Sequence, residues 1–191
     1  MDSYLTLIGS IVIGGLLLFS VFNFQSEAKQ HSFEYSNSLI LQHTAMSVIE
    51  LLEQDLRQIG YGYNFPALSV FASDSITFYA DLFDDGVLDT VNYRLGDVSE
   101  TPGTTNPRDK IFYRWVNSEP QIDAALGVTN FQLIFFDAAG DTTVNLTDIR
   151  TIEVTLEFES TEPYYDKLTT MPKYASYYWR EKITPMSLQP L

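Results

Sequence analysis

An uninterrupted apolar segment runs from Tyr4 to Phe24, and no charged residue occurs between Ser3 and Ser26. As a helix this segment would be about 30 Å long, which matches the hydrocarbon core of a bilayer. Such a segment is a cleaved signal peptide, a membrane anchor or the buried core of a polymer. Because the start has no Lys or Arg and the following SEAKQ is a poor cleavage site, cleavage of the whole segment is disfavoured.

The helical pattern continues beyond the apolar segment as an amphipathic one. Apolar residues recur at steps of three and four up to Gly60, a typical helix stop: Leu41, Ala45, Val48, Leu52, Leu56 and Ile59. We therefore expect one helix over residues 4–59, about 80 Å long. The acidic and basic residues near its end are expected to point away from the apolar stripe: Glu50, Glu53, Asp55 and Arg57.

After Gly60 the hydrophobic period changes to two, which predicts strands. Residues 76–82 and 91–95 form a predicted hairpin around Asp84-Asp85-Gly86, and further strands are expected at 111–116, 128–136, 149–160 and 177–183. In the strand at 149–160, apolar and polar residues alternate, so one face should be buried and the other exposed to solvent. The apolar residues are Ile152, Val154, Leu156 and Phe158, and the polar ones are Glu153, Thr155, Glu157 and Glu159. Residues 98–110 and 160–174 read as exposed loops.

These patterns predict an α+β fold with three regions. Residues 1–24 form the transmembrane or polymerisation half of the helix, and residues 25–60 form its amphipathic stalk half. Residues 61–191 form an antiparallel β-sheet head, whose apolar face would cover the stripe of the stalk. The first half of the helix then needs a bilayer or neighbouring helices around it.

Composition excludes several classes of function. The formal net charge is -14 over 191 residues, so the acidic head is not expected to bind nucleic acid. The chain contains no cysteine, which excludes disulfides and thiolate metal sites. We find no nucleophile elbow and no glycine-rich phosphate loop, so neither an enzyme nor a small-molecule substrate is expected.

Small residues in the apolar segment suggest close helix packing. Ser10 and Gly14 are four residues apart with Gly15 adjacent, which is the small-xxx-small arrangement of helices that pack in lipid. Glycine and serine are also common in membrane helices, so the pair alone does not decide between packing and chance. The full set of candidate helix-packing residues is Asp2, Gly9, Ser10, Gly14, Gly15 and Leu17.

Three aspartates of the predicted hairpin partly match a calcium loop. Calcium-binding loops need oxygen ligands at alternating positions and a glycine at the turn, and Asp81, Asp85 and Asp89 fall on some of these positions with Gly86 at the turn. Phe83 occupies a ligand position, however, and a hairpin turn explains the same residues without a metal. No other cofactor is expected. His31 and His43 are twelve residues apart on the predicted helix, so they are expected at the surface and not around one metal.

Several features resemble the type IV pilin and pseudopilin superfamily. LLEQDLRQIGYG at 51–62 is similar to the end of the helix in PilW-type minor pilins, and ITFYADLFDDGVLDTVNYRL and YYWREKITPMSL are similar to segments of their heads. The resemblance implies a pilin-like fold, a cytoplasmic-membrane precursor with an extracytoplasmic head, and assembly into a filament at the cell surface. The dense aromatic residues near the C-terminus suit an interface or the core.

The N-terminus departs from the family pattern. Leu5-Thr6-Leu7-Ile8-Gly9 is the closest match to F-T-L-I-E, with Tyr4 in place of the cleavage glycine and Gly9 in place of the glutamate. In the family that glutamate is thought to neutralise the terminal ammonium of a neighbouring subunit. Asp2 is a candidate substitute for it, and the alternative is that Asp2 caps the helix.

The resemblance implies a structural subunit that assembles with copies of itself or with related subunits through its apolar helix. The alternative is a membrane-anchored binding or assembly factor of a secretion or adhesion system that does not polymerise. Lys29 is the one basic residue near the span, and read alone it would place the head inside. The extracytoplasmic position of the head is therefore an implication of the resemblance.

Overall fold

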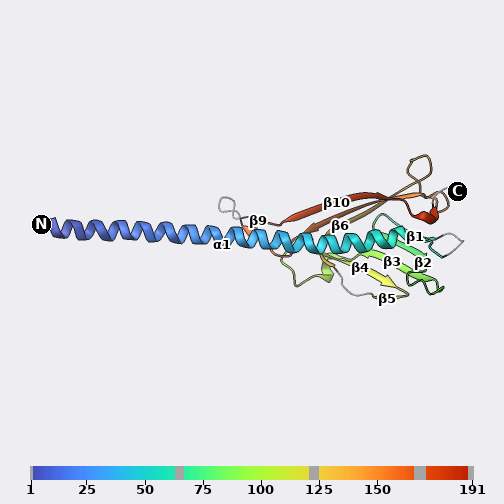
Figure 1. The fold of residues 1–191 in the computed structure, drawn as a ribbon, viewed down its shortest axis with the longest axis horizontal. Helices are drawn as coiled ribbons and strands as arrows, with labels where there is room; N and C mark the ends of the chain where they lie inside the picture. Colours follow the sequence, from blue (N-terminus) through green and yellow to red (C-terminus); the bar gives the residue numbers. More distant parts are fainter. Residues whose placement is uncertain (1, 63–66, 121–124, 166–170, 189–191) are drawn as a thin grey trace.

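A computed structural model describes residues 2–62, 67–120, 125–165 and 171–188. One helix, α1 (Asp2–Arg57), comes first and a sheet follows it. In Figure 1 the N-terminal part of α1 projects away from the sheet, and its C-terminal part lies against it. This is the pilin-like α+β architecture that the sequence predicted.

The strands form one antiparallel sheet in the order β1-β2-β3-β4-β6-β7-β10, with β5 paired to β4, and a separate pair, β8-β9. Two short 3₁₀ helices, η1 and η2, complete the head. The bounds are β1 Leu68–Phe71, β2 Ser75–Ala80, β3 Asp89–Leu95, η1 Val98–Glu100, β4 Lys110–Val116, β5 Glu119–Pro120, β6 Ala125–Phe136, β7 Thr151–Glu159, β8 Tyr164–Tyr165, β9 Pro172–Lys173, β10 Ser176–Ile183 and η2 Met186–Leu188.

The end of α1 follows from its sequence. Gly60 has φ +75°, a conformation that costs glycine little and that closes the last turn. The amide of Gly60 then donates to the carbonyl of Tyr79 in β2 at 2.8 Å. A side chain at Gly60 would also collide with Ser187, because a Cβ there would lie 2.4 Å from its hydroxyl. The helix therefore stops where the chain must turn directly into the sheet.

The core lies between the stalk half of α1 and one face of the sheet. The predicted stripe is buried from Leu41 onward except at the half-buried Val48, with Ala45, Leu52 and Leu56 each 0% exposed. The side chains that complete this core come from seven strands, β1, β2, β3, β4, β6, β7 and β10, and include Ile76, Phe78, Val91, Phe131, Val154, Leu156 and Phe158. The four long predicted strands and the hairpin are confirmed, with Ile76 of β2 opposite Tyr93 of β3.

Two sequence predictions about exposure are wrong. Asp55 does not point away from the stripe; it is 3% exposed. Glu153 and Thr155 are on the predicted wet face of β7 but are also buried, since Arg180 and Lys182 of the neighbouring β10 extend over Glu153. Long basic side chains cover polar groups in this way while keeping their charge near water.

Candidate assembly surface

The apolar half of α1 has no cover within the chain. Among the described residues, every large apolar side chain from Tyr4 to Phe24 is exposed, with exposed fractions from 50% at Val21 to 76% at Tyr4. One helix of the described chain is long and apolar enough to cross a membrane, and its most apolar 18-residue window has mean hydropathy 2.4 and is 0% buried. Fourteen such side chains in water represent roughly 20–40 kcal/mol of unburied hydrophobic surface.

Two hydroxyl groups in this half are satisfied by the helix itself. The hydroxyl of Ser10 donates to the carbonyl of Leu7 at 2.8 Å, and the hydroxyl of Thr6 donates to the carbonyl of Ser3 at 3.0 Å. An apolar surrounding requires this arrangement, because an unpaired polar group costs several kcal/mol there. The surface is therefore compatible with lipid or with other helices.

The predicted helix-packing residues stand on this half. At 100° per residue, Ser10, Gly14 and Leu17 share one face, whereas Gly9 and Gly15 lie to either side of it. A Cβ added at Gly9, Gly14 or Gly15 would meet no atom within 4 Å. These glycines therefore serve no packing inside the chain. Asp2 is the first residue of α1, but its side chain lies outside the described residues, so both readings of Asp2 stay predictions.

The stalk half is held to the head by a buried polar contact that sequence reasoning missed. Asp55 of α1 accepts hydrogen bonds through Oδ2 from the hydroxyl of Tyr93 at 2.6 Å and from Nε of Arg114 at 2.7 Å. Nε of Arg114 also lies 3.1 Å from the Tyr93 hydroxyl oxygen, to which it donates. Burial first, and then the charge of Asp55, raises the pKa of Tyr93 well above its usual value.

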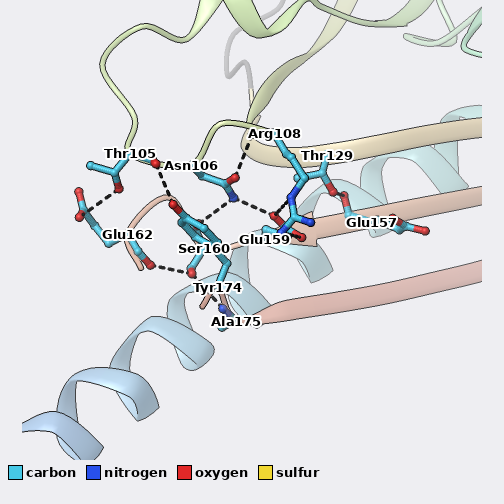
Figure 2. Close-up of polar contacts among 10 residues, drawn as sticks. All are labelled: Thr105, Asn106, Arg108, Thr129, Glu157, Glu159, Ser160, Glu162, Tyr174 and Ala175. Carbon is cyan, nitrogen blue, oxygen red and sulfur yellow. Dashed lines mark hydrogen bonds and ion pairs between the residues drawn. The ribbon is translucent and has the colours of Figure 1, made fainter. Parts of the chain in front are cut away.

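The two predicted loops are also held together. Figure 2 shows Asn106 donating through Nδ2 to Glu159 at 2.9 Å and to the carbonyl of Ser160 at 3.2 Å. Arg108 forms an ion pair with Glu159 at 2.8 Å, and the hydroxyl of Tyr174 donates to the carbonyl of Thr105 at 2.8 Å.

The sequence prediction that both loops are exposed is therefore wrong for parts of each loop. Asn106 is 2% exposed and Ser160 is 6% exposed. Asp109, in the same loop as Asn106, is 0% exposed. The part of the second loop at residues 166–170 lies outside the described residues.

The aspartates of the proposed calcium loop are occupied by backbone groups. Asp81 accepts from the amides of Asp85 at 3.1 Å and Gly86 at 2.8 Å, and Asp89 accepts from the amide of Leu82 at 3.1 Å. Within the described ranges no group of three or more His, Asp or Glu side chains is arranged to hold a metal ion. These bonds are the contacts of a turn, and calcium binding stays a prediction.

A pocket of about 230 Å³ opens between α1, Tyr164 of β8 and the start of β10 at Ala175 and Ser176. Its lining has one carboxylate, Glu34, which already accepts a hydrogen bond from Gln30 at 3.1 Å. His31 and His43 are both exposed on α1, as the sequence predicted. Comparisons with protein-family models, curated proteins and solved structures found no match to this chain.

Proposed function

We propose that this protein is a structural subunit of an extracytoplasmic pilus-like or pseudopilus-like filament. The observation that carries the proposal is the uncovered apolar half of α1, which is joined without a break to a half that the head covers. Before assembly the apolar half is inserted in the cytoplasmic membrane, and in the filament it packs against copies of itself or related subunits. The subunit performs no catalysis and binds no nucleic acid or small-molecule substrate.

Packing between subunits is supported by the free space at Gly14. A larger side chain there meets no atom of its own chain, and alanine or leucine forms helix more readily than glycine. An assembly defect on enlarging Gly14 would therefore report a contact with another chain. Heterologous contacts between identical helices, repeated without closure, produce an open helical filament.

The test compares Gly14→Leu with the matched variant Val12→Leu on the opposite face of α1. Each protein is measured in two fractions of the producing cells: membranes, and surface fibres released by shearing and viewed by electron microscopy. We expect both variants to insert in membranes. Overpacking at a helix contact costs about 1–3 kcal/mol, so Gly14→Leu should reduce the subunit in fibres about tenfold or more, whereas Val12→Leu should resemble the parent.

The outcomes separate two functions. If the parent protein is absent from fibres but present in membranes, it is a membrane-anchored factor that does not polymerise. If the amount of Gly14→Leu in fibres equals that of the parent, then Ser10, Gly14 and Leu17 do not form the face through which subunits pack.

A further inference from the structure

The β8-β9 pair is the part of the described head that contacts α1 nearest to its apolar half. The side-chain amide of Gln30 donates to the backbone carbonyl of Tyr165 at the end of β8. Gln30 is also the first residue of α1 beyond the apolar segment that is half-buried. In Figure 1, β9 is the labelled strand closest to the N-terminal part of the helix. This pair therefore stands at the border between the two halves of α1.

The position of Gln30 gives the height of this pair above a membrane. Gln30 is six residues beyond Phe24, the last large apolar residue of the segment, which corresponds to about 9 Å along the helix. The headgroup layer on each side of a bilayer is roughly 5–8 Å thick. A head fixed to α1 at this level has side chains within reach of that layer when the apolar half fills the hydrocarbon core.

Two apolar side chains of this region are exposed. Tyr165 is 55% exposed, and Met171, directly before β9, is 70% exposed. Tyrosine is enriched at membrane interfaces, because its ring is apolar and its hydroxyl stays hydrated. The exposed charges nearby are of both signs, Glu162 and Lys173, and the whole chain carries a formal charge of -14, so a strongly anionic bilayer is disfavoured. Uncharged or zwitterionic headgroups fit this surface.

We propose that Tyr165 and Met171 form a membrane-contact surface that lies in the zwitterionic headgroup layer of the inserted subunit. The inference rests on the proposed function only in that α1 must insert. Contact of Tyr165 and Met171 with the headgroups sets the distance of the head from the membrane and limits how far the subunit can tilt. Leaving the membrane for a filament must break the contact, so it is a step of assembly that acts on each subunit separately.

The absence of cysteine makes the test direct, because a single introduced cysteine is a unique labelling site. The full chain is placed in phosphatidylcholine vesicles with an environment-sensitive fluorophore on Met171→Cys. Quenching by headgroup-spin-labelled phosphatidylcholine is then measured. The matched control is Val144→Cys, which is 82% exposed in the loop between β6 and β7. That loop is at the other end of the nine-residue β7, about 30 Å from the β8 side.

A third label at Leu16→Cys, with an acyl-chain spin label as quencher, reports insertion of α1 separately. We expect quenching at Leu16 and about twofold or more stronger headgroup quenching at Met171 than at Val144. Quenching at Leu16 with equal values at Met171 and Val144 would overturn the membrane contact and leave the filament proposal intact. No quenching at Leu16 would overturn both. Emission from Met171→Cys that reports an apolar environment without quenching by the spin-labelled lipid would overturn the membrane contact and assign the surface to a second copy.

Discussion

Asp55 determines where along α1 the head is fixed. An apolar stripe with steps of three and four residues can be matched to a sheet at more than one height, because each turn of the helix resembles the next. A buried carboxylate allows only one match. Asp55 must meet Tyr93 of β3 and Arg114 of β4 together, so a shift by one turn separates the carboxylate from both of its partners and leaves Arg114 without its counter-ion.

Replacing Asp55 by alanine should therefore destabilise the head, because both of its hydrogen bonds are lost. Arg114 would keep its charge next to the core without a counter-ion, although its side chain is 17% exposed and retains some water. We expect the free energy of unfolding to fall by about 2–4 kcal/mol. Denaturant unfolding of the full chain in detergent, followed by the near-ultraviolet signal of its tyrosines, measures the change.

The matched control for Asp55 is Glu50→Ala, which removes an exposed carboxylate from the same helix. Its effect should stay within about 0.5 kcal/mol, as is usual for surface substitutions. Equal stabilities for the two variants would show that the polar contact adds nothing to apolar packing.

At the scale of elements, the segments 98–110 and 160–175 act together. Asn106 of the first segment donates to Ser160 of the second and to Glu159 at the end of β7, and Ser160 in turn accepts from the amide of Ala175 at 3.1 Å. Figure 2 shows these contacts beside the start of β10. Loss of these contacts in the first segment should therefore also destabilise the second segment, although the two are 50 residues or more apart in sequence.

Asn106→Ala tests this coupling. The variant leaves Glu159 and the carbonyl of Ser160 short of a donor, which costs roughly 1–3 kcal/mol for buried groups. We expect faster hydrogen exchange of backbone amides in 160–165 and 171–175 as well as in 98–110, measured by mass spectrometry. Asn145→Ala is the control, because Asn145 is exposed and bonds only locally to Asp148. Faster exchange confined to 98–110 would contradict the coupling.

The elements that the sequence predicted are those with strong periodicity. The helix, the hairpin and the four long strands were predicted because each repeats its apolar positions several times. β1, β5, β8 and β9 were not, since two to four residues give no measurable period. The burial of Asp55, Asn106 and Glu153 was missed for another reason: polar residues read as exposed until a partner distant in sequence is known, and one sequence does not identify Arg114, Ser160 or Arg180 as those partners.

At the scale of the whole molecule, the two halves of α1 have separate physical tasks. One stripe of the stalk half is buried against the head from Leu41 to Leu56, whereas no large side chain between Tyr4 and Phe24 is buried. Folding of the head therefore draws no burial energy from the first half, and that half keeps its apolar surface for lipid or other chains. The calcium and ammonium-pairing hypotheses are not required for this division.

The division predicts that a variant without residues 1–24 folds and does not associate. Its head retains the core and the contact of Gln30 with Tyr165, so its free energy of unfolding should match that of the detergent-solubilised full chain within about 0.5 kcal/mol. Light scattering in detergent-free buffer should give a monomer for this variant and large assemblies for the full chain, because only the full chain exposes the apolar half. If the truncated protein associates at micromolar concentration, the assembly surface lies on the head and not on the apolar half. If the truncated protein is unfolded, residues 1–24 are needed for the fold.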